Sequence, residues 1–248
     1  MTQTAISVEK LSVSYYGKNI LHDISFSFQK GNLIGIIGPN GAGKSTLIKA
    51  LLGLIPQDHG KVLIDGRPVK KVQKRIAYVP QRSDIDWDFP INVLDTVLLG
   101  TFPHLGLFKR PGNKEKKLAY ECLDQVKMKH FSDSQIGELS GGQQQRVFLA
   151  RALAQQANVF FLDEPFVGID VSSERVIINI LKQLRDAGKT IFIVHHDLSK
   201  VKDYFDQVIL LNKKLIDAGA VDTVFKHDLL RETYQEQFQF FNELGVNV

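Results

Sequence analysis

Residues 38–46 of this chain read Gly38-Pro39-Asn40-Gly41-Ala42-Gly43-Lys44-Ser45-Thr46, and they are the strongest indication of its architecture. Its residues from Gly38 to Ser45 match the pattern G-x-x-x-x-G-K-[ST]. A short apolar run, Leu33 to Ile37, comes directly before it, and helical spacing continues from Thr46 to Leu54. The pattern therefore stands between a predicted strand and a predicted helix, as a phosphate-binding loop requires.

The residue types in this loop suit phosphate oxygens. Glycines allow backbone conformations in which successive N–H groups converge on one anion. The helix that follows points the positive end of its dipole at the same place. Lys44 can reach the β- and γ-phosphates of a nucleotide, and the Ser45 hydroxyl can bind Mg²⁺. We therefore predict a site for a nucleoside triphosphate with Mg²⁺.

A second element with chemistry is Asp163-Glu164-Pro165, which follows the apolar run Val159 to Leu162. Alone, two acids after a strand usually mean only that the strand reaches solvent. Carboxylates at the carboxyl end of a parallel strand, however, lie where α/β sheets bind ligands. Beside a phosphate loop, Asp163 is expected to bind Mg²⁺, and Glu164 to orient or deprotonate an attacking water.

The third element is Leu139-Ser140-Gly141-Gly142-Gln143. Ser140 and Gln143 have the spacing of a capping box before a helix that runs to Ala154. Glycines beside a helix start also leave bare N–H groups for an anion. One loop already holds the nucleotide, so a second anion site predicts a nucleotide shared between two molecules.

Outward from these motifs, short strands and helices alternate along the chain. We predict strands at residues 6–15, 20–28, 33–37, 61–64, 75–79, 159–162, 190–194 and 207–211, and helices at 46–54, 143–154 and 172–185. Residues 83–157 carry helical spacing without a convincing strand. The pattern indicates a doubly wound α/β core with a helical insertion and a helical tail from about Val221.

Composition is that of an ordinary globular protein: 248 residues, 44% hydrophobic and 23% charged. The net charge of +4 is too weak to imply nucleic acid, and we expect no such partner. The sequence contains no run of eighteen apolar residues, so it predicts no membrane-spanning helix. Met1 to Ala5 lacks the pattern of a signal peptide, and a single cysteine, Cys122, fits a reducing compartment. A cytoplasmic protein is expected.

In their order and spacing, the three elements resemble the nucleotide-binding subunit of an ABC transporter, and Leu139 to Gln143 is the specific part. The resemblance runs from Ile6 to about Ala220. It implies an α/β fold: a P-loop NTPase (RecA-like) core with an antiparallel β subdomain and an inserted helical subdomain. The core with its β subdomain would take residues 1–82 and 159–220, the helical subdomain 83–158, and a helical tail 221–248.

The resemblance assigns three further residues. Tyr16 resembles the aromatic that stacks on adenine, with Tyr15 beside it as a competitor. Gln81 resembles the glutamine that meets Mg²⁺ and the attacking water. Asp170 resembles the aspartate that signals across the dimer. The cofactors implied are ATP and Mg²⁺, while the preference for ATP over GTP depends on Tyr16 and on this analogy.

The pair His195-His196 leaves an ambiguity. In the family, the switch histidine that contacts the γ-phosphate directly precedes an acidic residue. Because Asp197 follows His196, we assign the switch to His196. A metal site at His195, His196 and Asp197 is the weaker interpretation, since neighbouring side chains on a strand point to opposite faces.

The function implied is an ATPase that sandwiches ATP between two copies of itself and drives a separate transmembrane permease. Residues Asp84 to Pro90, after Gln81, are similar to the matching segment in the ATPases of manganese, zinc and iron importers. Trp87 and Phe89 either anchor the membrane partner or only pack the edge of the insertion. The expected cargo is a divalent transition metal, manganese favoured, held by the permease and a metal-binding solute receptor.

This assignment places the chain at the cytoplasmic face of the membrane as a peripheral subunit. The alternative is a soluble ABC-type ATPase of a cytoplasmic assembly such as iron–sulfur cluster biogenesis. Co-purification with a permease or with a soluble scaffold separates the two.

Overall fold

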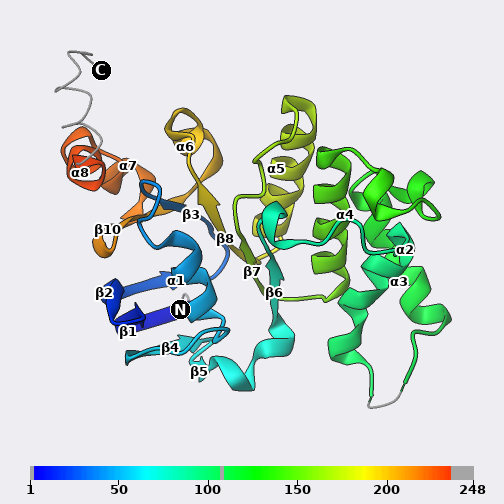
Figure 1. Cartoon of the computed structure of the whole chain (residues 1–248), viewed down its shortest axis with the longest axis horizontal. Coiled ribbons are helices and arrows are strands. Elements are labelled where there is room, and N and C mark those ends of the chain that lie inside the picture. Colours follow the sequence, from blue (N-terminus) through cyan, green and yellow to red (C-terminus); the bar gives the residue numbers. More distant parts are fainter. Residues whose placement is uncertain (1–2, 107–108, 236–248) are drawn as a thin grey trace. The chain divides into compact units, whose positions relative to one another are not determined.

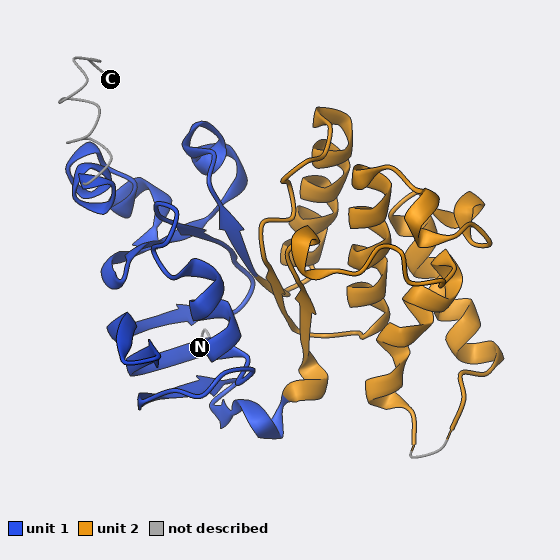
Figure 2. Ribbon diagram, in the orientation of Figure 1, with its two compact units in different colours: residues 1–72, 192–248 blue, residues 73–191 orange. Residues whose placement is uncertain are grey.

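The computed structural model of the protein describes residues 3–106 and 109–235. The chain divides into two compact units (Figure 2). Unit 1 comprises residues 1–72 and 192–248, and unit 2 comprises residues 73–191. The subdomain boundaries expected from the sequence stay a prediction, and part of the expected tail, 236–248, lies outside the described residues.

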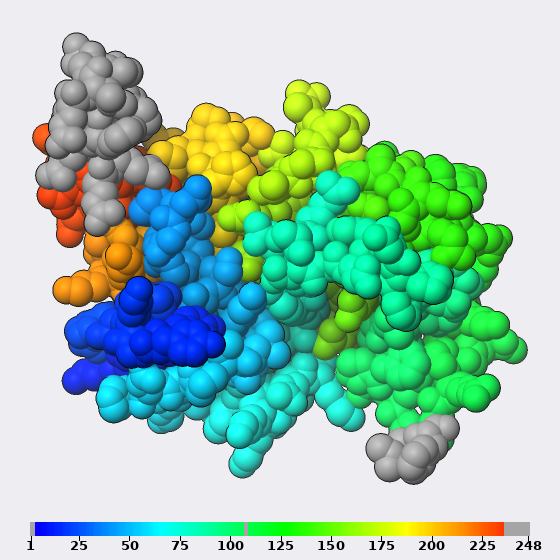
Figure 3. All heavy atoms as spheres, viewed as in Figure 1, coloured from blue at the N-terminus to red at the C-terminus, as the bar shows by residue number. Residues whose placement is uncertain are grey.

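The first sheet of unit 1 is antiparallel, in the order β2-β1-β4-β5. Its strands are β1 (Thr4–Tyr15), β2 (Lys18–Gln29), β4 (His59–Ile64) and β5 (Arg67–Pro68). The turn between β1 and β2 has positive φ at both Tyr16 and Gly17, the conformation that matches the twist of a hairpin. Buried and exposed side chains alternate along most of β2, so one face packs inward and one meets solvent. Figure 3 shows atoms of the N-terminal strands, in blue, at the surface.

The second sheet of unit 1 carries the phosphate loop. It runs β10-β9-β3-β8, with β3 (Leu33–Ile37) parallel to β9 (Gln207–Asn212) and β10 (Lys214–Ala220) antiparallel to β9. All five residues of β3 are buried, as expected of a strand covered on both faces. The helices of this unit are α1 (Lys44–Leu51), α6 (Val201–Tyr204), α7 (Val221–Val224) and α8 (His227–Thr233).

Unit 2 combines two parallel strands with a group of helices. β6 (Ile76–Val79) pairs with β7 (Val159–Leu162), and β8 (Thr190–His195) starts here and ends in unit 1. Helices α2 (Val93–Leu98), α3 (Asn113–Gln125) and α4 (Gly141–Ala154) contact one another, and α5 (Val171–Asp186) packs on α4 (Figure 1). The short 3₁₀ helices in the described part of the chain are Val69–Lys71, Gln73–Arg75, Arg82–Asp84, Leu99–His104, Lys129–Phe131, Ile136–Glu138 and Leu198–Lys200.

All three predicted helices differ from the structure by one to three residues at an end, and two of these differences have a clear physical cause. The helix expected at residues 46–54 ends at Leu51, because Gly53 takes a positive φ of 67°. The amides of Gly53 and Leu54 then bond back to the carbonyls of Ala50 and Lys49, which closes the helix end. The helix expected from Gln143 starts at Gly141, because glycines at a helix start carry no apolar periodicity. No helix within residues 3–106 and 109–235 combines the length and apolar character needed to cross a bilayer.

Candidate active site

The phosphate loop joins β3 to α1 within unit 1. The Lys44 ammonium folds back over the loop, and its Nζ donates to the carbonyls of Gly38 (2.8 Å) and Pro39 (2.9 Å). The first turn of α1 has no acidic residue, and Gly43 offers no side-chain cap. Because no side chain caps this helix start, its amides and the buried Lys44 charge together suit the binding of an anion.

Two glycines of the loop occupy places where another residue would not fit. A Cβ on Gly38 would come within 2.0 Å of the Leu211 carbonyl oxygen, so the loop starts in direct contact with β9. Gly43 has φ of +92°, and a Cβ there would lie 2.7 Å from the Leu21 side chain. The loop is also tied to the β9–β10 turn, where the Lys213 amide donates to the Ala42 carbonyl at 2.9 Å. These contacts fix the backbone of the loop against β2, β9 and the β9–β10 turn.

In unit 2, the two acids after β7 have different surroundings. Asp163 is 1% exposed, and its amide donates to the Val79 carbonyl at 3.0 Å. Glu164 is half-buried and has a positive φ of 49°, which costs a non-glycine residue about 1–2 kcal/mol. Its Oε2 accepts a hydrogen bond of 2.9 Å from Gln81 Nε2. The fold therefore brings together two residues, 83 positions apart, that the sequence assigned to the attacking water.

Tyr78 is a neighbour of this group that sequence reasoning missed. Burial raises the pKa of its hydroxyl well above the ordinary value, and the carboxylates of Asp163 and Asp84 raise it further. Tyr78 therefore stays neutral beside Asp163. In the sequence, Tyr78 is marked only by its place in the predicted strand at residues 75–79, and its pairing opposite Phe161 of β7 appears in the structure alone.

Residues 140–143 form the start of α4, with Ser140 as its N-cap and the capping box that the sequence predicted. The Ser140 hydroxyl accepts from the Gln143 amide (3.4 Å), and Gln143 Oε1 accepts from the Ser140 amide (2.8 Å), which makes a reciprocal cap. A Cβ on Gly142 would lie 2.3 Å from Ser173 Oγ and 3.1 Å from Asp170 Oδ2. The start of α4 thus packs closely on the start of α5.

Asp170 caps α5 and is exposed. Its carboxylate accepts hydrogen bonds from the Ser172 hydroxyl and from the Ser173 amide, the latter at 3.0 Å. These bonds, the Ser172 bond first, hold the pKa of the Asp170 carboxyl well below its usual range. Asp170 is therefore a fixed negative charge next to Gly142.

The sequence model of the ABC transporter family matches residues 21–167. This chain belongs to the ABC transporter family. It is 56% identical over 229 residues to the manganese transport system ATP-binding protein MntB of Listeria innocua, across 92% of this chain and 95% of that protein. It is 50% identical over 233 residues to the zinc transport system ATP-binding protein TroB of Treponema pallidum, across 94% and 88%.

A dimeric bacterial ABC transporter cassette has a similar structure, with a TM-score of 0.77 and 27% identity, across 87% of this chain and 98% of that one. The expected family and fold class are thereby confirmed. ABC cassettes are ATPases that form dimers and work with transmembrane permease subunits, and this chain is an ATP-hydrolysing subunit of that kind. The role of each site residue stays a prediction.

The structure distinguishes the two histidines of this ABC cassette by burial. His195 ends β8 and is 2% exposed, with the rings of Tyr204 and Phe205 at centroid distances of 5.9 Å and 5.6 Å. His196 is exposed. Asp197 caps the 3₁₀ turn that follows, and its bonds with the Ser199 hydroxyl and amide hold the pKa of its carboxyl below the usual value. Exposure therefore supports His196 as the switch residue.

Tyr16 lies at the tip of the β1–β2 hairpin with its ring fully exposed, while Tyr15 is 38% exposed. Exposure thus favours Tyr16 as the ring that stacks on adenine. Tyr16, the phosphate loop and His196 belong to unit 1, whereas Gln81, Asp163, Glu164, Asp170 and residues 140–143 belong to unit 2. The expected Mg²⁺ ligands Ser45, Gln81 and Asp163 therefore come from both units, and that set stays a prediction.

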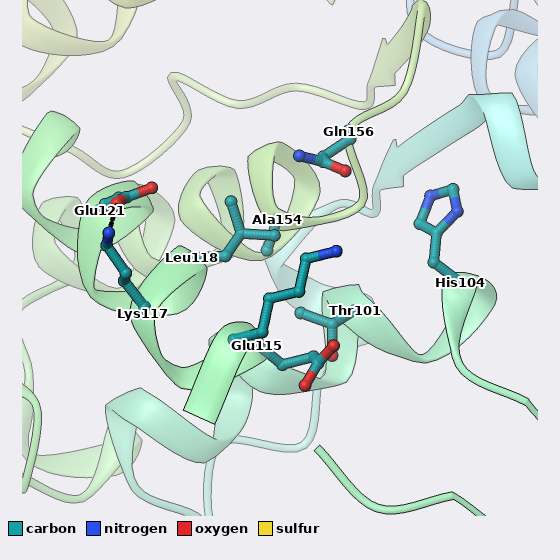
Figure 4. A pocket seen from close by; sticks show the side chains of 9 residues that line it. Thr101, His104, Glu115, Lys117, Leu118, Glu121, Ala154 and Gln156 are labelled. Carbon is teal, nitrogen blue, oxygen red and sulfur yellow. Dashed lines mark ion pairs between the residues drawn. The ribbon is translucent and has the colours of Figure 1, made fainter. Parts of the chain in front are cut away.

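A separate cavity of about 340 Å³ lies in unit 2 and contains none of the expected site residues (Figure 4). It is lined by Thr101, His104, Lys114, Glu115, Lys117, Leu118, Glu121, Ala154 and Gln156. Its two lysines are matched by two glutamates, and Lys117 and Glu121 approach to 4.0 Å. This balance gives no excess positive charge for a nucleotide. Among the described residues, no group of three or more His, Cys, Asp or Glu side chains could hold a metal ion.

Proposed function

We propose that this ABC cassette hydrolyses ATP to drive the import of a divalent transition metal, manganese favoured over zinc or iron, through a separate transmembrane permease. The observation that carries the proposal is the 56% identity to a manganese transport ATPase, together with 50% identity to a zinc transport ATPase, over nearly whole chains. The comparisons offer no support for the alternative of a soluble iron–sulfur assembly ATPase.

Nucleotide binding is proposed for unit 1. The backbone amides of residues 38–46 and the Lys44 ammonium would neutralise the phosphate charge, and Tyr16 would stack on the base. Lys44 now donates to the Gly38 and Pro39 carbonyls, so these donors would be redirected to phosphate oxygens when a nucleotide binds. His196, exposed at the end of β8, would contact the γ-phosphate.

Activation of water is proposed for Gln81 and Glu164. Gln81 donates to Glu164 Oε2 and so holds the carboxylate in one orientation. Oε1 has no hydrogen-bond partner within the described residues, and it would accept the proton of the attacking water. Mg²⁺, held by Ser45, Gln81 and Asp163, would neutralise the charge that develops on the phosphates. The buried Asp163 carboxylate and the Ser45 hydroxyl are oxygen ligands of the kind Mg²⁺ prefers.

A complete site would need a second copy of the chain. Ser140 is exposed at the start of α4, where the amides of Gly141 and Gly142 form an anion-binding helix start. In the proposed dimer these groups meet the γ-phosphate of the nucleotide on the partner copy, and Asp170 signals between the two sites. The similarity to a cassette solved as a dimer supports this arrangement.

A groove of about 220 Å³ in unit 2 is the proposed contact with the permease. It is lined by Ile85, Asp86, Phe89, Ile91, Thr96, Leu99, Ile136, Phe148 and Arg151. Phe89 is 57% exposed and Leu99 44% exposed at its rim. Trp87 instead packs on Phe148, with ring centroids 5.3 Å apart. These contacts support the packing interpretation for Trp87 and the partner-contact interpretation for Phe89, whose exposed ring would meet the permease.

The cargo itself would be held by the permease and its metal-binding receptor, and this subunit would lie at the cytoplasmic face of the membrane as a peripheral ATPase. The test is deletion of the gene, followed by measurement of manganese, zinc and iron uptake in cells without backup importers. We expect lower manganese uptake, restored by the unaltered gene and not by its Glu164→Gln variant. Unchanged uptake of all three metals would refute the proposal. Co-purification with a soluble scaffold instead of a permease would favour the alternative.

A further inference from the structure

Arg82, the residue after Gln81, joins two parts of unit 2 that are 62 residues apart in sequence. Its Nη2 and Nε donate to the same acceptor, Gln144 Oε1, at 3.0 Å and 3.3 Å. Gln144 directly follows the 140–143 segment in the first turn of α4. Because Arg82 directly follows Gln81, its planar guanidinium connects the backbone next to Gln81 to the start of α4, and the two hydrogen bonds fix its orientation.

The acceptor in this contact has a fixed orientation. Gln144 is 3% exposed, and its Nε2 donates to the Ile136 carbonyl at 3.1 Å. Both ends of the amide are therefore engaged. Rotation of the Gln144 side chain would break two contacts together, so a displacement of Arg82 is passed to α4 instead of being absorbed by a rotamer change.

A second contact lies one helical turn further along α4. The Arg82 carbonyl accepts from Trp87 Nε1 at 2.9 Å, and the guanidinium lies over the Trp87 ring, 5.6 Å from its centroid. Trp87 packs edge-on against Phe148 at 5.3 Å. Because Gln144 and Phe148 are four residues apart, they occupy one face of α4. Residues 82–87 therefore hold this face at two points.

Arg82 also lies against backbone that only glycine leaves accessible. A Cβ on Gly141 would come within 3.1 Å of Arg82 Nη1, and a Cβ on Gly168 within 3.5 Å. Gly141 belongs to the anion-binding start of α4, and Gly168 comes two residues before Asp170. The guanidinium is thus close to both segments expected to face a second copy of the chain.

We propose that Arg82 is a positioning residue that couples the hydrolytic pair Gln81–Glu164 of one site to residues 140–143, which serve the site on the partner copy. A change at the Gln81 side of one site is passed through Arg82 and Gln144 to the nucleotide of the other. The inference rests on the proposed two-copy site. It adds a link within each chain through which the two sites communicate.

Mixed dimers of full-length chains test this link. A Lys44→Ala chain mixed with a Gly142→Asp chain leaves one working site, with its phosphate loop from the second chain and its 140–143 segment from the first. Arg82→Met is then placed on either chain. We expect turnover to fall in both placements, by about tenfold, near the upper range for residues that couple sites without touching the ligand. ATP affinity measured with a fluorescent analogue should stay unchanged.

The dimer with Arg82→Met on the Lys44→Ala chain is the decisive test of coupling, because that chain contributes only its 140–143 segment to the working site. A loss of turnover there supports the coupling. If turnover is normal in this dimer and falls only when Arg82→Met is on the Gly142→Asp chain, Arg82 positions only Gln81 of its own chain. That result would overturn the proposal. If the mixture without any Arg82 change is inactive, the two-copy site itself fails, and the coupling fails with it.

Controls separate coupling from folding. Arg110→Met, on an exposed loop, should leave turnover and melting temperature unchanged. Arg82→Lys keeps the charge without the planar fork and should lower turnover at an unchanged melting temperature. Gln144→Leu should reproduce the loss caused by Arg82→Met, and the double variant should be no worse than either single one. Additive losses would show that Arg82 and Gln144 act separately and would contradict the proposal.

Discussion

Replacing Gly142 with Ala tests the closest contact of the 140–143 segment. The added Cβ would lie 2.3 Å from Ser173 Oγ and 2.7 Å from Ser173 Cβ. Ordinary contact begins near 3.4 Å, so α4 and α5 must separate by about 1 Å. Overpacking of this kind costs about 1–3 kcal/mol of folding free energy. In a protein of this size, each kcal/mol lowers Tm by about 2–4 °C.

The same displacement should cost far more activity than stability. An error of about 1 Å in a group that contacts the transition state can lower the rate about a hundredfold. We therefore expect Gly142→Ala to lower Mg-ATP hydrolysis by about that factor, while binding of a fluorescent ATP analogue to the monomer is unchanged. Phosphate release, analogue titration and thermal melting measure the three quantities.

A second change should relieve the clash. Ser173→Gly removes the two nearest atoms that the new methyl group would meet and leaves Asp170 Oδ2, at 3.1 Å, as the nearest remaining atom, so the Gly142→Ala/Ser173→Gly protein should recover much of its activity. Ser173→Gly alone is the matched control for loss of the serine. If Gly142→Ala hydrolyses ATP normally, or if the double variant is no better than Gly142→Ala, close packing of α4 on α5 does not position this segment, and the reasoning is refuted.

Four further outcomes are expected. Glu164→Gln should still bind ATP, stop turnover and accumulate a nucleotide-bound dimer in size-exclusion chromatography with Mg-ATP; a monomeric or fully active variant would contradict its role as base. Tyr16→Ala should weaken ATP binding about tenfold, consistent with loss of one stacked ring, whereas Tyr15→Ala, measured by the same titration, should change it little. Phe89→Ser should leave the ATPase activity of the isolated subunit unchanged and reduce co-purification with the permease. Unchanged co-purification would contradict the proposal that the groove around Phe89 binds the permease. Because the pKa of Asp170 is lowered in the folded state, its carboxylate stabilises the fold fully above the ordinary Asp pKa of about 4, and this stabilisation is lost as pH falls below that value. Asp170→Asn should therefore show a smaller fall in Tm than the unaltered protein between about pH 4 and pH 2. Equal falls in Tm would show that Asp170 contributes nothing to the acid sensitivity of the protein.

Local elements could be predicted because their signals are contiguous. The apolar runs Leu33–Ile37 and Val159–Leu162 are strands with the predicted bounds. The Ser140–Gln143 cap follows from two residues three positions apart. By contrast, β10 (Lys214–Ala220) was missed, because its residues are mostly half-buried and show no clear alternation. A half-buried edge strand such as β10 shows little alternation of apolar and polar residues, so its sequence alone does not reveal it.

The phosphate loop, the acids after β7, the 140–143 cap and the family can all be recognised from the amino-acid sequence, since each depends on residue types at short spacing. Three other features depend on packing: the exposure of His196, the exposed ring of Phe89 beside the packed ring of Trp87, and the contact of Gln81 with Glu164. Partners such as Arg82 and Gln144 lie 62 positions apart, and nothing local to either residue specifies the other. Their contact exists because the strands and helices that carry them pack together, and packing depends on the whole of unit 2.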